Sequence, residues 1–316
     1  MKRILPGLIA MLLLLSACAA TGRAPSGSPS GDASSPPNGG SDGIEHPAGS
    51  EVILAITSAG GMLSVQFQVT QVPVFVLTGD GRVIVQGAQT LEFPGPALPP
   101  LIERRLTEGG VQAVLSALED TNLFAGDLEL RGMQNMIADA NDTIFTLDAG
   151  GVETVVTVYA IGMLMPDMDP PPGVDEAELE NYRVLSTLYE RLLMLDDWLP
   201  ADAWATDGWM PYEPEAFRLY VRDVTDQPVE DGDLPGQVRE WPTDEDPAAF
   251  GEEIAGFGDG TRCGVVEGDA AATWFVELTN ANQNTTWSGG GDRRFAIQPR
   301  PLLPHEAPVC PELDAG

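Results

Sequence analysis

Residues 74–86 read Val-Phe-Val-Leu-Thr-Gly-Asp-Gly-Arg-Val-Ile-Val-Gln, and this stretch decides the kind of fold that the chain can adopt. Two apolar runs, 74–78 and 82–86, flank the turn Gly79-Asp80-Gly81. Apolar runs on either side of such a turn predict a β-hairpin, whose strands are antiparallel. A doubly wound fold would instead need strict alternation of strands and helices, which this chain lacks.

A second hairpin and two helices follow the first hairpin. The runs 143–148 and 152–159 flank a Gly-rich turn. Thr107 can cap one helix, and Asp175 can start a longer one that ends at Pro200. In both segments apolar residues recur with helical spacing, and we expect these to be buried: Val111, Val114, Leu115 and Leu118, then Leu179, Tyr182, Leu185, Leu188 and Leu192.

The remaining segments complete an α+β body with antiparallel sheets, hairpins and helices packed on one face. Leu63, Val65, Phe67 and Val69 alternate with polar residues, which predicts a half-buried strand over 63–70. Further strands are expected at 51–57, 217–224, 263–266 and 294–298, and a helix capped by Asp269 is expected to bury Ala271, Phe275 and Leu278. The irregular stretch 201–215 and the acidic stretch 225–260 suggest two subdomains, 51–200 and 201–316.

The N-terminus has the layout of an export signal. Lys2 and Arg3 precede an apolar run, 4–15, that leads into Leu15-Ser16-Ala17-Cys18. A basic start, a short apolar run and small residues are typical of a secretory signal peptide. The Leu-Ser-Ala-Cys ending resembles a bacterial lipobox, which implies cleavage before Cys18 and a lipid on its thiol. The run is shorter than the roughly 20 residues of a membrane-spanning helix, and an ordinary cut after Ala20 is the other alternative.

The segment that follows has the composition of a spacer. Gly, Ser and Pro occupy 19 of the 32 positions 19–50, and Ile44 is the only large apolar residue there. Such a segment cannot bury enough apolar surface to order itself. We therefore expect a signal peptide over 1–17, a flexible tether over 18–50, and a folded body from Glu51 onward.

The chain has three cysteines. If Cys18 carries a lipid, then Cys263 and Cys310 remain as an even pair in an exported protein, and such a pair favours a disulfide. Two free thiols or a metal pair are the alternatives, although His305 is the only nearby histidine and a zinc site would lack ligands.

Several motifs together resemble a family of uncharacterised bacterial lipoproteins. Beside the lipobox and the tether, these are VPVFVLTGDGRVIV, PGPALPPLIERRLTEGGVQAVL, REWP, AAFG, RCGVV and RPLLP, which span most of residues 70–310. The resemblance implies an envelope location and a paired cysteine in the C-terminal part. It implies no active-site residues, because the function of the family is unknown.

Charge and missing motifs exclude several functions. The formal net charge is −32, which repels phosphate backbones and argues against nucleic acid as a partner. Adaptation to salt or a codon bias would give the same composition. Lys2 is the only lysine, so no lysine nucleophile or Walker lysine exists in the body. His46 and His305 are the only histidines, and we assign no catalytic residue.

Other clusters have a structural explanation as well as a functional one. The acidic groups Asp139–Asn141–Asp142, Asp167–Asp169 and Glu230–Asp231–Asp233 lack EF-hand spacing. The Met163, Met165 and Met168 set has soft thioether ligands but no supporting His or Cys. Gly256 to Gly260 reads as a turn rather than a phosphate loop. Trp198, Trp204, Trp209 and Tyr212 fit either a ligand platform or packing between subdomains.

These observations favour a non-catalytic binding or structural module that is anchored to the cell membrane through Cys18, on its extracytoplasmic face. In a cell with two membranes, the outer membrane is the alternative location. An envelope protein or a glycan is the expected kind of partner, and no cofactor or metal is assigned. The competing hypotheses are an envelope hydrolase with paired carboxylates, which leave no fixed motif, and a metal binder built on Met or Asp.

Overall fold

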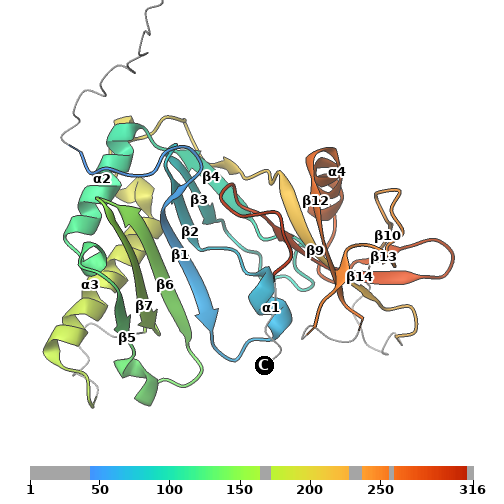
Figure 1. The fold of residues 1–316 in the computed structure, drawn as a ribbon, viewed down its shortest axis with the longest axis horizontal. Helices are drawn as coiled ribbons and strands as arrows, with labels where there is room; N and C mark the ends of the chain where they lie inside the picture. Colours follow the sequence, from blue (N-terminus) through green and yellow to red (C-terminus); the bar gives the residue numbers. More distant parts are fainter. Residues whose placement is uncertain (1–42, 164–171, 228–236, 256–259, 312–316) are drawn as a thin grey trace, which may run out of the picture. The chain divides into compact units, whose positions relative to one another are not determined.

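The computed structural model describes residues 43–163, 172–227, 237–255 and 260–311. Within these ranges the chain forms two open, mostly antiparallel sheets and four α-helices (Figure 1). The expected α+β fold is confirmed. The predicted lipidation site Cys18, the acidic groups at 167–169 and 230–233, and the methionines Met165 and Met168 lie outside the described residues.

The first sheet has eight strands in the order β5-β7-β6-β1-β2-β3-β4-β8, and only β5 and β7 are parallel. The hairpin of residues 74–86 forms its centre. The strand bounds are β1 Val52–Gly60, β2 Phe75–Thr78, β3 Arg82–Gln86, β4 Leu101–Arg105, β5 Leu128–Leu130, β6 Asn141–Ala149, β7 Val152–Tyr159 and β8 Met210–Pro211.

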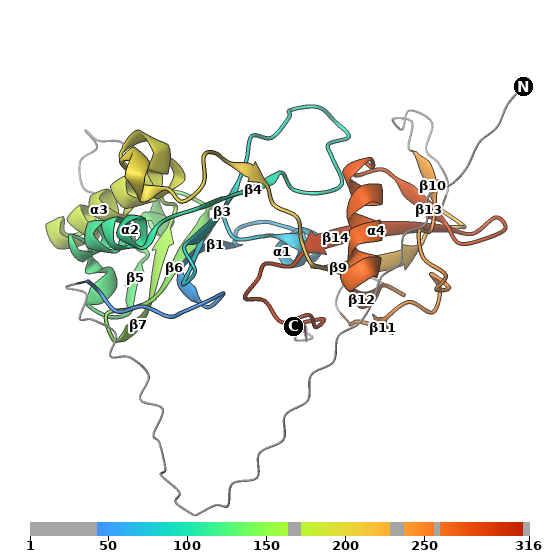
Figure 2. The same cartoon turned by 90° about the horizontal axis from the view of Figure 1, so that it is seen from above.

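Two helices cover one face of this sheet, α2 (Glu108–Glu119) and α3 (Glu176–Leu193) (Figures 1 and 2). Thr107 and Asp175 cap them as predicted, each accepting a hydrogen bond from a backbone amide of the first turn. Every helix residue expected in the core is buried there. Short 3₁₀ helices flank them: η1 Asn122–Phe124, η2 Gly132–Asn135, η3 Leu195–Asp197 and η4 Ala201–Ala203.

The folded body begins before the predicted boundary at Glu51. The amide of Asp80, in the hairpin turn, donates to the carbonyl of Gly49 at 2.7 Å. A Cβ at Gly79 would overlap the carbonyl of Pro47, so this position needs glycine for the close approach. Ile44 packs against the first core. Backbone contacts hold residues 43–50, and apolar composition alone does not reveal such contacts.

The strand predicted over 63–70 is wrong, because this segment forms the short helix α1 (Val65–Thr70). Ser64 caps it, since its side chain accepts a hydrogen bond from the Phe67 amide. None of the α1 residues is buried, and Phe67 is 54% exposed. The alternation of apolar and polar residues therefore does not mark a half-buried sheet face here.

The second sheet has six strands in the order β10-β13-β14-β9-β12-β11. It contains the predicted strands at 217–224, 263–266 and 294–298, and adds short ones that the sequence did not indicate. The bounds are β9 Ala216–Asp223, β10 Val238–Glu240, β11 Glu252–Glu253, β12 Arg262–Glu267, β13 Thr286–Ser288 and β14 Arg294–Pro301. The stretch 201–215 belongs to the first sheet through β8, which pairs with β4.

Helix α4 (Gly268–Thr279) covers one face of the second sheet. Asp269 does not cap it as predicted. Glu267 occupies the N-cap position without a side-chain hydrogen bond, and Asp269 lies in the first turn. Trp274, rather than the predicted Phe275, is fully buried. The centroid of its ring lies 4.9 Å from that of Trp241 and 5.0 Å from that of Trp287.

Candidate functional site

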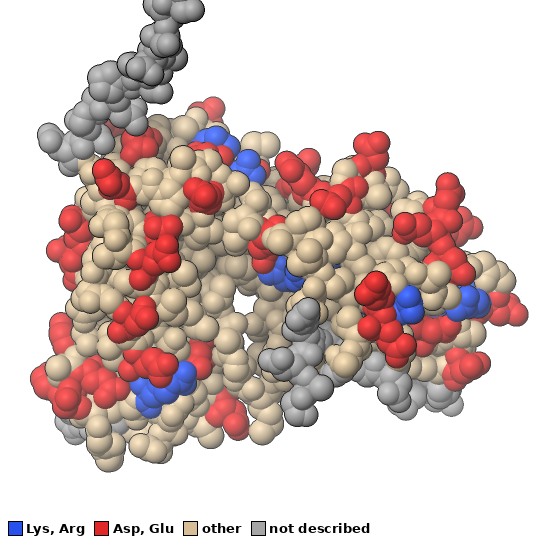
Figure 3. All heavy atoms as spheres, viewed as in Figure 1, with Lys and Arg blue, Asp and Glu red and all other residues tan. Residues whose placement is uncertain are grey.

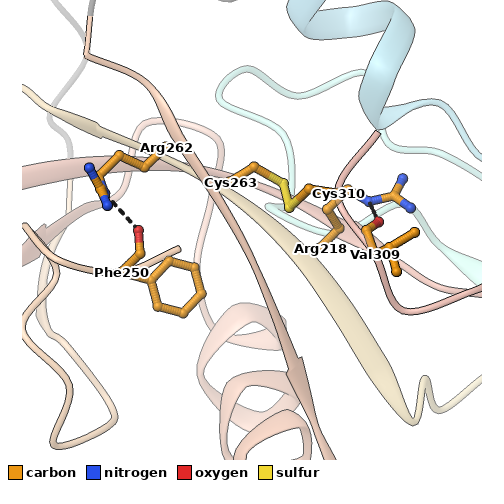
Figure 4. Close-up of a disulfide and its surroundings, with 6 residues drawn as sticks. All are labelled: Arg218, Phe250, Arg262, Cys263, Val309 and Cys310. Atoms are coloured by element: carbon orange, nitrogen blue, oxygen red, sulfur yellow. Dashed lines mark hydrogen bonds between the residues drawn. A yellow bond between two sulfur atoms is a disulfide. The ribbon is translucent and has the colours of Figure 1, made fainter. Parts of the chain in front are cut away.

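The two C-terminal cysteines form the expected disulfide (Figure 4). Cys263 on β12 is bonded to Cys310, with their Cα atoms 6.1 Å apart. The Arg218 guanidinium donates to the carbonyl of Val309 at 2.8 Å and so fixes the tail beside the bond. The disulfide therefore joins the C-terminal tail to the face of the second sheet that lies opposite α4.

The register of the strands defines that face. Directly paired residues of neighbouring strands point to the same side. Tyr220 on β9 is paired with Cys263 on one side and with Gln298 on the other, and Arg222 is paired with Ala296. The alternate residues of β9 are Phe217, Leu219 and Val221, which are buried in the core beneath α4. The second sheet thus has an apolar face under α4 and a more polar face that carries the disulfide.

A pocket of about 220 Å³ lies on this polar face, where α1 contacts β14. The residues at the start of α1 supply one wall, and the strands β9 and β14 supply the other together with Thr261, which directly precedes β12. Among the described lining residues, every side chain is uncharged except one arginine. These residues are Ser64, Gln66, Tyr220, Arg222, Thr261, Ala296 and Gln298.

Thr261 contributes a buried hydroxyl that lacks a partner. The residue is 2% exposed, and its Oγ1 makes no hydrogen bond in the described part of the chain. It stands two residues before Cys263 and lines the pocket. A buried polar group without a partner costs about 1–3 kcal/mol, so this hydroxyl is an unusual feature of the pocket wall.

Arg222 is exposed, and it differs from the other arginines of the described ranges. Its side chain makes no hydrogen bond, ion pair or ring contact there. By contrast, the neighbouring Arg218 donates to Val309, and Arg262 donates to the carbonyl of Phe250. An arginine without a partner is unexpected in a chain with 48 acidic residues.

A second group of charged residues holds the part of the C-terminal segment that precedes Cys310 in the sequence. The Arg300 guanidinium binds the Glu306 carboxylate, with Nη1 and Oε2 2.7 Å apart, and its Nε donates to the carbonyl of Gln71 at 3.0 Å. Burial acts to raise the pKa of Glu306, but the hydrogen bonds and charge of Arg300 outweigh it and lower that pKa. For the half-buried His305, burial has the opposite effect and lowers the pKa, because the protonated form of histidine is the charged one.

The larger groove near this ion pair has a volume of about 870 Å³. Its carboxylates are the exposed Glu213, Glu215 and Glu267, together with Glu306. A general acid of a glycosidase needs a raised pKa, whereas Glu306 has a lowered one. Glu306, which is bound to Arg300, therefore does not fit the role of a general acid.

The other clusters of the sequence have structural partners. Trp204 packs edge-on against Trp209 at 5.7 Å, and Arg104 lies 3.9 Å above the Trp204 ring. Asp142 binds Arg131 at 3.0 Å. Met163 is exposed. Among the described residues, no group of three His, Cys, Asp or Glu side chains has a metal-binding arrangement.

The pocket residues were not predicted from the sequence. The only available signal was the alternation of Tyr220 and Arg222 with Phe217, Leu219 and Val221, which places the first two opposite the core. Nothing in the sequence indicates that α1 packs beside them.

In the ranges that the structure covers, no helix is long and apolar enough to cross a bilayer. No protein-family model matches the chain, and neither a similar curated protein nor a similar solved structure was found.

Proposed function

We propose that this protein is a binding module held on the extracytoplasmic face of a membrane by a lipid on Cys18. The observation that carries the proposal is the bond between Cys263 and Cys310. It accounts for both C-terminal cysteines and leaves Cys18 as the single thiol of the chain. A structural disulfide is also typical of an exported protein. The lipobox and the Gly/Ser/Pro-rich segment after it support the same location.

The binding part of the proposal rests on the polar pocket. A preformed concavity in which a few polar groups converge is the usual form of a small-molecule site. The exposed Arg222 guanidinium has no partner among the described residues, and it is the group that a ligand would satisfy. We propose binding rather than hydrolysis, because the carboxylates of the large groove are exposed or bound to arginine.

Mass spectrometry of the mature N-terminus tests the anchor. Wild-type protein should begin at Cys18 and carry the added mass of a diacylglycerol, and Cys18→Ser should lose both the modification and the membrane fraction. An unmodified Cys18, or a cut after Ala20, would reject the anchor.

Thermal unfolding tests the pocket without assuming a ligand. The full chain, purified in detergent, is measured with and without the small-molecule fraction of an envelope extract. Ala296 lines the pocket, so Ala296→Phe should fill part of it. The extract should raise the melting temperature of the wild type and leave that of Ala296→Phe unchanged, because only a ligand of the native state stabilises it. Equal shifts in both proteins would reject the pocket as a site.

A further inference from the structure

We infer that the pocket between α1 and the β9–β12–β14 face binds a small carboxylate that also carries hydroxyl groups, of the type represented by a sugar acid. The inference rests on the proposed binding function and names the ligand class of that same pocket. It is carried by the charge, the hydrogen-bonding groups and the size of the pocket.

The charge of the pocket favours a single negative group. Among the described residues, Arg222 is the only charged one that lines the pocket, and none of the lining residues there is a carboxylate. Figure 3 shows acidic side chains spread over the visible face of the molecule, with only small groups of basic ones. A lining with one cation and no acid is therefore a place where an anion meets local attraction. A planar guanidinium presents two parallel donors to a carboxylate, which gives a strong and oriented pair.

A single guanidinium also distinguishes between anions. One arginine neutralises the single charge of a carboxylate. A phosphate monoester carries about −1.5 to −2 charges at pH 7, and the described part of the lining offers no second cation to balance the excess. The chain's net charge of −32 would repel the more highly charged ligand more strongly.

The neutral groups of the pocket indicate what the rest of the ligand carries. A carboxamide such as that of Gln298 both donates and accepts hydrogen bonds, and the hydroxyl of the exposed Ser64 does the same. Such groups suit hydroxyl groups, which also do both. Gln298 is exposed at the pocket, so its carboxamide is accessible to such a ligand.

The size of the pocket limits the ligand to about one sugar ring. Its volume of about 220 Å³ lies below the roughly 300–1,000 Å³ typical of sites for drug-sized molecules. A short-chain hydroxy acid or a single uronic acid fits this limit, whereas a long polysaccharide segment would have to extend beyond the mouth, where Arg222 and Gln298 are exposed.

Isothermal titration of the full chain in detergent, at constant ionic strength, provides the test. The probes are D-glucuronate, D-glucose, which lacks the carboxylate, and inorganic phosphate. Glucuronate should bind measurably, and glucose and phosphate at least about tenfold more weakly, the loss expected when a charge-assisted pair is not made.

Two variants separate binding from folding. Arg222→Gln should weaken glucuronate binding about tenfold and leave the melting temperature unchanged, because the side chain is exposed and has no partner. Gln298→Ala should also weaken binding and leave the melting temperature unchanged, because this side chain lines the pocket and is exposed. The matched control is Arg183→Gln, which makes the same change in charge at an ion pair of α3 and should leave binding unaltered.

Several results would overturn the inference. These are no binding of glucuronate, equal binding of glucose, tighter binding of phosphate, or equal losses in Arg222→Gln and Arg183→Gln. If the envelope extract still stabilises the wild type and not Ala296→Phe, then only the ligand class fails and the binding function stands. If the extract has no such effect and glucuronate does not bind, both proposals fail.

Discussion

At the scale of single residues, Arg300 connects parts of the chain that are far apart in the sequence. Its guanidinium binds the Glu306 carboxylate and the carbonyl of Gln71, and the same carboxylate accepts from the Leu303 amide at 2.8 Å. Arg300 is 8% exposed and Glu306 is 19% exposed in their side chains. A pair this shielded from water is strongly destabilised when one partner loses its charge, because the other is left uncompensated.

This pair predicts a pH dependence of stability. The folded protein lowers the pKa of Glu306 from its ordinary value of 4.5. The carboxylate therefore contributes stability that is present above pH 4.5 and is lost as the pH falls through the lowered value. Glu306→Gln should destabilise by about 2 kcal/mol at pH 7, the range for hydrogen bonds to charged groups. The difference from wild type should shrink as the pH is lowered below 4.5.

Urea unfolding of both proteins at several pH values measures this difference. Glu180→Gln is the control, because that carboxylate is 63% exposed and lies 3.6 Å from Arg183. Its loss should change stability by less than about 1 kcal/mol at any pH. A difference between wild type and Glu306→Gln that does not vary with pH would contradict an ionised Glu306 in the folded state.

At the scale of elements, the predicted strand over 63–70 and the observed helix α1 lead to different expectations for the same side chains. A half-buried strand would hide all four apolar residues of 63–70 on one face. In the helix, Phe67 is 54% exposed, whereas Val69 packs against the cluster of Tyr220 and Cys263. Phe67→Gln should therefore change stability by less than about 0.5 kcal/mol, and Val69→Gln should cost about 1 kcal/mol or more. Equal, large losses in urea unfolding would support the strand.

The elements predicted well from the sequence are those that carry their own local signals. The hairpin turn Gly79-Asp80-Gly81 and the caps Thr107 and Asp175 act within a few residues, so the sequence contains all that they need. The disulfide followed from the parity of cysteines in a chain that was expected to be exported.

The elements missed from the sequence depend on partners far along the chain. Strand β13 is only three residues long and exists because β14 and β10 pair with it. The pocket combines α1, which follows the first strand of the first sheet, with strands more than a hundred residues later. Periodicity cannot show that Thr261 lacks a partner, since that is a property of the packed surroundings.

At the scale of the whole molecule, the C-terminal tail runs from the second sheet to the first and back. Leu303 packs in a cluster with Val76 and Ile84 of the central hairpin, and the Tyr212 hydroxyl donates to the carbonyl of Leu302 at 2.8 Å. Seven residues later, Cys310 returns to β12 through the disulfide. The covalent bond therefore closes a segment that includes α4, β13, β14 and the contact with the first sheet.

Removing this bond should destabilise the body as a unit. The loop between Cys263 and Cys310 spans 47 residues, for which the chain-entropy model gives about 4 kcal/mol, an effect on the unfolded state. The double variant Cys263→Ala with Cys310→Ala should lose about this much in urea unfolding. Its unfolding curve should remain a single transition, because the tail contacts both sheets in the folded state.

Cys18→Ser is the matched control: it removes a cysteine outside the described residues and should leave the unfolding of the body unchanged. If Cys18→Ser loses as much stability as the double variant, the disulfide is not the source of that stability. If the double variant unfolds in two separate transitions, the bond couples the two sheets, and the packing of the tail does not.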